Sequence, residues 1–215
     1  MKKLLYKELR LALHPASVAF IFLSAMLLIP NYPYYVAFFY TCLGIFFTCL
    51  TGRENHDILY TAMLPVKKRD VVTARILFAI ILQVIQVIAA IPFMFIRRSM
   101  PVPPNQVGME ANLAMLGIAF VLMGLFNLVF FGIYCKTPKK VGKSFVAAAV
   151  VMFAAMLIAE ILAHFPYIST VLDSFDAAYL PQRAAVFIAG LLIYVLLCAA
   201  AICSGRRGFE KYDID

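Results

Sequence analysis

Charged residues are scarce in this chain: they make up 14% of its 215 residues, while 64% are hydrophobic. A water-soluble domain is usually about half apolar and about a quarter charged. Six long apolar runs divide the chain, and at about 20 residues per membrane span they occupy more than half of it. The composition therefore excludes a sizeable soluble domain. It predicts a single integral membrane domain over residues 1–215.

The sequence also lacks the motifs of several chemistries. Its five cysteines are odd in number and lie in or at the ends of the apolar runs, so neither a disulfide framework nor a zinc site is expected. Val141-Gly-Lys-Ser144 ends like a phosphate-binding loop, but Thr137 stands where the motif requires its first glycine. No arrangement typical of a nucleophilic enzyme stands out. We expect no catalytic residue, metal or cofactor on this chain, and no hydrolysis of ATP by the chain itself.

Acidic residues are nearly absent from the apolar runs. Only Glu160 comes close, near the outer end of the fifth run, with His164 four residues further on. The two could form an interfacial pair or, alternatively, serve a proton-linked role. A transporter coupled to an ion would be expected to place acidic residues deeper in its spans.

The cations that are present are sorted along the chain. Of the 19 lysines and arginines, all but Arg97, Arg98 and Arg183 fall in the N-terminus, in every second gap between apolar runs, or in the C-terminus. Cationic loops stay on the cytoplasmic side of a membrane, so both termini are expected inside. The sorting points to anionic lipid headgroups and argues against nucleic acid. The predicted fold is all-α, with six spans at about 11–29, 34–50, 76–96, 112–135, 144–164 and 184–203.

The segment before the first span has two interpretations. Residues 1–13 mix cations with leucines, so they could form an amphipathic helix at the membrane interface or simply the polar start of the first span.

The longest inner gap, residues 51–75, is predicted to hold a short helix. Thr51 and Glu54 fit a capping box at its start, and Leu64-Pro65 would end it. The helix is either a connector on the lipid surface or a docking site for a cytoplasmic partner. The docking interpretation assigns contacts to Glu54, Asn55, His56, Asp57, Tyr60 and Thr61, and an anchoring role to Pro65, Lys67, Lys68, Arg69 and Arg75.

Residues 54–77, ENHDILYTAMLPVKKRDVVTARIL, resemble the first cytoplasmic loop of the permease subunits of type-2 ABC exporters. The resemblance rests on Leu64-Pro65-Val66, the basic residues Lys67 and Lys68, the valine pair Val71-Val72 and Arg75 before the third span. It implies a pair of permease chains, identical or related, with two separate ATPase subunits that bind ATP and magnesium. Residues 54–64 would be the coupling helix.

The similar branch includes exporters of phenol-soluble modulins and bacteriocin-like peptides, which implies an amphipathic peptide or a lipid-like compound as cargo. The alternative is a stand-alone membrane protein without ATP, such as an immunity factor or a small secondary transporter.

Three further patterns carry predictions. An apolar repeat predicts an amphipathic outer helix over residues 168–179, between the fifth and sixth spans. Gln83, Gln86 and Asn127 lie inside spans, where they either line a substrate path or form hydrogen bonds between helices. Small residues predict close-packing surfaces in the fourth and fifth spans: Gly117, Gly124, Gly132, Ala148, Ala155 and Ala159.

Overall fold

The computed structural model describes residues 1–103, 105–173 and 175–211, and all secondary structure in this part of the chain is helical. Five helices are long and apolar enough to cross a membrane. They are α3 (Tyr35–Glu54), α5 (Lys68–Ser99), α6 (Leu113–Tyr134), α7 (Val141–Ala163) and α9 (Leu180–Glu210). These helices confirm the all-α membrane fold. They contain the second to sixth predicted spans, apart from single residues at the ends of α3, α6 and α7.

The first predicted span is a broken one. The N-terminal segment α1 (Lys2–Lys7) and the π-helix η1 (Glu8–Ala12) meet α2 (Pro15–Ile21) and the 3-10 helix η2 (Phe22–Leu28) at 87°. Pro15 disfavours helical backbone at the residue before it, and His14 is extended, with its ring accepting a hydrogen bond from the Ala16 amide. The helix that leads into the first loop therefore begins at Pro15, after the bend, and not at residue 11. If the bent pair counts as one span, the chain crosses the membrane up to six times.

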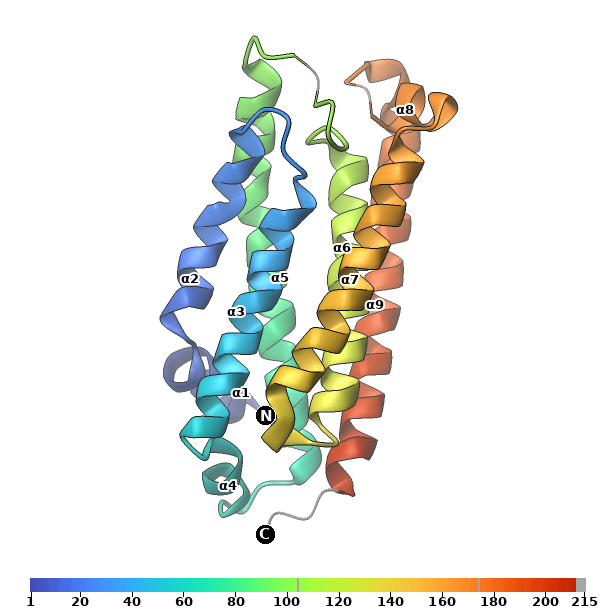
Figure 1. Ribbon diagram of the computed structural model, residues 1–215. Coiled ribbons are helices and arrows are strands. Elements are labelled where there is room, and N and C mark those ends of the chain that lie inside the picture. Colours follow the sequence, from blue (N-terminus) through green and yellow to red (C-terminus); the bar gives the residue numbers. More distant parts are fainter. Residues whose placement is uncertain (104, 174, 212–215) are drawn as a thin grey trace.

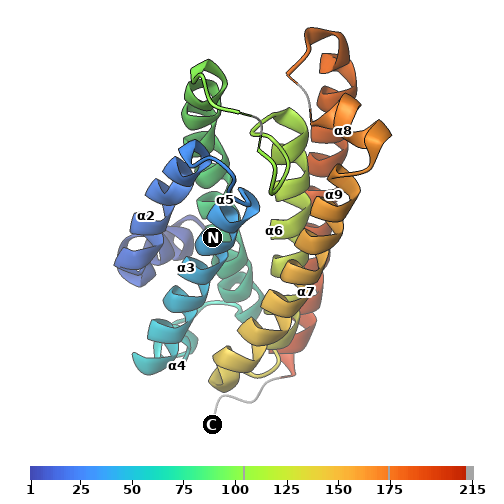
Figure 2. The same cartoon turned by 45° about the horizontal axis from the view of Figure 1, so that its top comes forward.

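The helices form two groups that run side by side (Figure 1). In the first, α2 and η2 pack against α3 and α5; in the second, α6 packs against α7 and α9. Contacts of α5 with α9 and of α3 with α7 join the groups. The N-terminus, α4 and the end of α9 lie at one end of the bundle, here called the basic end (Figures 1 and 2). The other end, here called the opposite end, carries the loops before α3 and α6 together with α8.

Helices α5 and α9 extend furthest beyond their predicted bounds at the basic end. Helix α5 begins at Lys68, so the predicted anchor residues Lys68, Arg69 and Arg75 lie on the helix itself and not in a loop before it. Helix α9 continues to Glu210 and carries Arg206 and Arg207 in its last turns. The hydropathy pattern marks where apolar residues stop, whereas a helix continues as long as its backbone hydrogen bonds do.

The short helix of the inner gap begins later than expected. Helix α3 continues through Thr51 to Glu54, and α4 occupies Asp57–Ala62. The predicted capping box at Thr51 and Glu54 is therefore wrong, because both residues are part of α3. The chain turns between the two helices at Asn55 and His56, and His56 has a φ of 52°, in the left-handed region.

The predicted outer helix is also shorter than expected. Helix α8 covers Pro166–Leu172, and a separate 3-10 turn, η4, covers Ala177–Tyr179. The Asp173 carboxylate accepts a hydrogen bond from the Glu110 amide (2.5 Å), and the Asp176 carboxylate caps the new turn at Ala178 (3.0 Å). These side-chain hydrogen bonds to backbone amides take the place of helical hydrogen bonds where the predicted helix breaks. Ser174, which belongs to the predicted helix, lies outside the described residues.

Gly117 and Gly124 of α6 lie close against α9. A Cβ added to Gly117 would lie 2.7 Å from the carbonyl oxygen of Val186, and one added to Gly124 would lie 2.9 Å from the Leu197 side chain. The predicted close-packing surface of the fourth span therefore faces the sixth span.

Candidate functional site

Helix α4 is tied to the rest of the bundle by a cluster of four charged side chains. The Arg75 guanidinium of α5 lies 2.6 Å from the Glu8 carboxylate and also contacts the Asp57 carboxylate of α4. The Lys7 ammonium completes the cluster, at 2.8 Å from Asp57 and 3.0 Å from Glu8. Three segments far apart in the sequence thus meet at one point: the N-terminal helix, α4 and the start of α5.

This cluster, here called the ion cluster, is largely removed from water. The side chains of Glu8 and Arg75 are 1% and 6% exposed. A charge buried to this degree is tolerated when it is paired and hydrogen-bonded, and two acids balance two bases here. Burial alone would raise the pKa of Asp57, but the charge of Arg75 and the hydrogen bond from Lys7 outweigh it, so the pKa lies below its usual value. Asp57 is therefore ionised at neutral pH.

The predicted docking residues divide between two faces of α4. Asp57 and Thr61 point into the bundle, and the Thr61 hydroxyl accepts a hydrogen bond from Lys7 (3.0 Å). Tyr60 points outward with 68% of its surface exposed, next to the exposed Met63 and Leu64. An exposed apolar patch of this kind is typical of a protein contact surface.

The remaining predicted residues surround α4 without joining the cluster. Glu54 at the end of α3 is exposed and pairs with the neighbouring Arg53 (2.5 Å), and Asn55 and His56 are exposed in the turn before α4. After α4, Pro65, Lys67 and Lys68 are exposed. Arg69 is also exposed and pairs with Glu210 at the end of α9.

A wide groove opens beside this site. Its volume is about 860 Å³, and it separates the N-terminal helix from the loop that follows α4. The lining residues are Met1, Lys2, Lys3, Leu4, Lys7, Leu64, Pro65, Val66, Lys67 and Asp70. The basic end thus offers a cationic groove next to the apolar patch of α4.

Sequence reasoning missed Lys7 and Glu8 as members of the site. Both precede α4 by about 50 residues, and no local pattern brings them together. One signal was available: Glu8 is the one acidic residue among the basic and apolar residues of positions 1–13. An acidic residue in a basic interfacial segment suggests a specific ionic partner.

The three predicted pathway residues lie deeper, in hydrogen bonds between helices. Gln83 of α5 and Asn127 of α6 exchange two bonds, at 2.9 and 2.7 Å, and the Tyr194 hydroxyl of α9 donates to Gln83 at 2.8 Å. Gln86 donates to Ser24 of η2 at 3.0 Å. All three predicted residues are fully buried. These contacts favour the alternative interpretation, hydrogen bonding between helices, and a role in a substrate path stays a prediction.

We expect Gln83→Leu to destabilise the bundle by about 1–3 kcal/mol, because it removes both hydrogen bonds between Gln83 and Asn127 and the acceptor of the Tyr194 hydroxyl. Unfolding in mixed micelles measures the change. The double variant Gln83→Leu/Asn127→Leu removes both polar groups, so it should cost less than the sum of the two single variants. Additive losses would show that the two amides do not act as a pair.

At the opposite end, Glu160 and His164 do not pair through their side chains. The Glu160 carboxylate accepts a hydrogen bond from the Met109 amide (3.1 Å). The His164 ring contacts the carbonyl oxygens of Glu160 (2.7 Å) and Gln106 (3.4 Å), and these two acceptors raise the pKa of His164. Both residues hold the loop before α6 against the end of α7.

The sequence model of the family described as "ABC-2 family transporter protein" matches residues 3–206. The match covers all five long helices apart from the end of α9, together with the bent N-terminal pair and α4. The chain therefore belongs to the ABC-2 transporter family. Comparison with curated proteins and with solved structures gave no match.

Family membership and the apolar helices together define a multi-pass protein of the plasma membrane. It is a membrane component of an ABC transporter, and in general such components work with ABC ATPase partners. The part of the chain that the structure describes holds no group of three or more His, Cys, Asp or Glu side chains arranged to bind a metal.

Proposed function

We propose that this chain is the permease subunit of an ATP-driven exporter, in which two permease chains form the translocation pathway and each binds one ATPase subunit. The basic end would face the cytoplasm, as the sorting of cations suggests. ATP and magnesium would be bound by the ATPase subunits. In this proposal α4 is the coupling helix.

The observation that carries the proposal is the two-faced arrangement of α4. Its outward face presents Tyr60 to solvent, with the exposed Met63 directly after the helix, while Asp57 on its inward face binds Arg75 of the spanning helix α5. A partner that pushes on Tyr60 would therefore move α5 directly, because an ion pair joins the two helices. A loop on the lipid surface would not need such a connection. Transport coupling requires an element of this kind that a nucleotide-driven partner can bias.

The cargo is proposed to be an amphipathic peptide or a lipid-like compound. This part rests on the resemblance of residues 54–77 to a branch of peptide exporters. The competing function is a stand-alone membrane protein without ATP coupling. One version of it, a secondary transporter coupled to an ion, would be expected to place acidic residues deep in its spans, and the predicted spans of this sequence have none there.

We expect Tyr60→Ala to weaken capture of the partner ABC ATPase subunit, by about tenfold if Tyr60 is a central contact. The variant should leave stability unchanged, because Tyr60 is 68% exposed and lies outside the ion cluster. The measurement is co-purification from membranes, followed by the response of ATPase activity to candidate peptides.

Asp57→Asn is the matched variant on the inward face. It should still allow capture but uncouple ATPase activity from cargo, since it weakens the link between α4 and α5. Val146→Ala, which removes an exposed side chain on α7, serves as a surface control. If no ABC ATPase is captured by the unaltered chain, the stand-alone membrane protein becomes the better explanation.

A further inference from the structure

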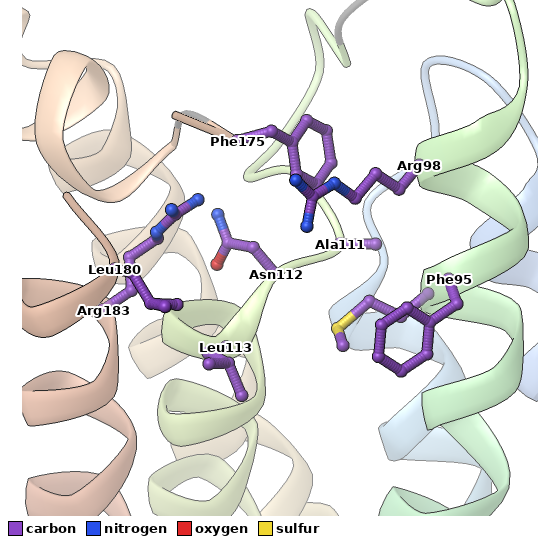
Figure 3. A pocket seen from close by; sticks show the side chains of 9 residues that line it. Phe95, Arg98, Ala111, Asn112, Leu113, Phe175, Leu180 and Arg183 are labelled. Carbon is purple, nitrogen blue, oxygen red and sulfur yellow. The ribbon is translucent and has the colours of Figure 1, made fainter. Parts of the chain in front are cut away.

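The loop before α6 lies between the two helix groups at the opposite end of the bundle. Residues 105–112, here called the strap, lead into α6, whose first turn is capped by the Asn112 side chain. Figure 3 shows Ala111 and Asn112 where the strap enters α6, beside a pocket of about 220 Å³. The strap therefore forms part of the wall of this pocket. The pocket is lined by Met94, Phe95, Arg98, Ala111, Asn112, Leu113, Phe175, Leu180 and Arg183.

On one side the strap is bound to the first helix group. The side-chain amide of Asn105 donates to the carbonyl oxygen of Tyr32, in the turn before α3, at 2.9 Å. The Glu110 carboxylate lies 3.7 Å from the Arg97 guanidinium of α5, and both side chains are buried. Glu110 also accepts a hydrogen bond from the backbone amide of Asn105 (2.5 Å), which fixes the strap against its own start. The strap is thus joined to α5 and to the turn before α3.

On the other side the strap is bound to the end of α7 and to the segment after it. The Met109 amide donates to the Glu160 carboxylate of α7 at 3.1 Å. The next amide, that of Glu110, donates to the Asp173 carboxylate at 2.5 Å. The side-chain amide of Asn112 donates to the last carbonyl oxygen of α8 at 2.7 Å. The strap therefore connects the two helix groups through side-chain hydrogen bonds as well as through the chain itself.

Three carboxylates converge on the strap. Glu110, Glu160 and Asp173 each accept a hydrogen bond from a backbone amide of the strap. The basic groups that face them are Arg97, which pairs with Glu110, and His164, whose ring lies 3.4 Å from a strap carbonyl oxygen. Like charges held this close repel each other, and the repulsion falls when one carboxyl takes up a proton. The contacts of the strap are therefore linked to protonation.

Asp173 lies outside the spanning helices, in the break after α8. Burial and repulsion by Glu110 raise the pKa of its carboxyl to about 6, although the hydrogen bond from the Glu110 amide and the charge of His164 lower it in part. The Tyr35 hydroxyl of α3 also lies near Asp173 and is uncharged at these pH values. A carboxyl whose pKa is raised in the bound state holds its proton more firmly there than in water. The contribution of Asp173 is therefore fully present below about pH 4 and is lost as the pH rises through about 6.

We propose that the strap is a proton-sensitive tie between the two helix groups, which binds both groups firmly while Asp173 is protonated and loosens when Asp173 ionises. A protonated carboxyl still accepts the Glu110 amide through its carbonyl oxygen, so proton uptake removes repulsion without breaking the contact. Loosening lets the groups separate at the opposite end. At the basic end Arg206 of α9 still donates to the Thr73 hydroxyl of α5 at 2.8 Å. This inference does not depend on coupling to ATP.

The test is amide hydrogen exchange of the Met109 and Glu110 amides in the full-length protein in neutral detergent. Each rate is divided by the rate of an unfolded peptide at the same pH. Between about pH 5 and about pH 7.5 we expect this corrected rate to rise about tenfold, because ionisation weakens the closed strap. The rise is smaller than the whole change in pKa would give, since solvent screens the half-buried Asp173.

Two matched variants decide which group is responsible. Asp173→Asn keeps an oxygen that accepts the Glu110 amide but cannot ionise, so its corrected rate should stay low at both pH values. Asp176→Asn, three residues further along, changes a carboxylate that caps Ala178 and should keep the full pH dependence. An unaltered protein without pH dependence, or an Asp173→Asn variant that retains it, would overturn the proposal. So would its loss in Asp176→Asn, which would indicate a general effect of charge.

A second measurement follows the separation of the two helix groups. Spin labels replace the exposed Ile96 of α5 and Leu162 of α7, and Cys203→Ser removes the exposed native cysteine. We expect a narrow distribution of distances at acidic pH and a longer, broader one at neutral pH. Labels at the exposed Glu54 of α3 and Lys143 of α7 report on the basic end and should show no change. A change of equal size at both ends, or none at either end, would contradict the proposed tie.

Discussion

Arg75→Met is expected to destabilise the protein by about 3–5 kcal/mol, the cost of leaving a buried charge without its partner. Arg75 contacts both Glu8 and Asp57, and Glu8 is only 1% exposed. Methionine preserves much of the length of the side chain, so the loss reports mainly on charge. The measurement is the free energy of unfolding in mixed micelles at neutral pH, where Asp57 is ionised.

The matched control is Arg69→Met, six residues earlier on α5. Arg69 also pairs with an acidic residue, Glu210, but its side chain is 62% exposed. An exposed pair contributes at most about 1 kcal/mol. Glu8→Gln should rescue part of the loss in the Arg75→Met background, because it removes the uncompensated charge. Equal losses at Arg75 and Arg69 would contradict the buried cluster.

Gly190→Ala is expected to cost about 3 kcal/mol, toward the upper end of overpacking substitutions in protein interiors. A Cβ at this position would lie 2.6 Å from the carbonyl carbon of Gly117 and 2.8 Å from its Cα. These are backbone atoms, so no side-chain rotation can relieve the contact. Helices α6 and α9 would have to move apart along their length, which loosens the contact that holds the second helix group together. Unfolding in mixed micelles again measures the loss.

Gly132→Ala provides the control on the same side of α6. A Cβ there would meet only the Ser204 hydroxyl, at 3.7 Å, which is ordinary contact. Alanine is favoured over glycine in a helix interior by up to about 1 kcal/mol, so this variant should be neutral or stabilising. If both variants had the same effect, helix propensity and not the approach of α6 to α9 would explain the result.

The five long helices could be predicted from the sequence because membrane insertion is decided locally. A run of apolar residues of sufficient length partitions into the bilayer whatever its neighbours are. The local signals that failed lie at helix ends. Thr51 and Glu54 fit a capping box, yet they lie within α3, because the spanning helix continues past the apolar run. Residues 168–179 keep an apolar repeat, yet Asp173 and Asp176 use their carboxylates on backbone amides and divide the segment.

The sequence by itself determined that this protein is a membrane bundle, where its long helices lie, and which loop resembles that of type-2 ABC permeases. Each of these depends on hydropathy, charge or a short motif, all of which are local. Only the tertiary structure decided that Asp57 faces Arg75 while Tyr60 faces outward. It also decided that Glu8, 67 residues before Arg75 in the chain, binds the Arg75 side chain. The pocket that Arg98 and Arg183 share is likewise a result of the fold. These contacts join residues far apart in the chain, and side-chain direction at such points is set by the packing of whole helices.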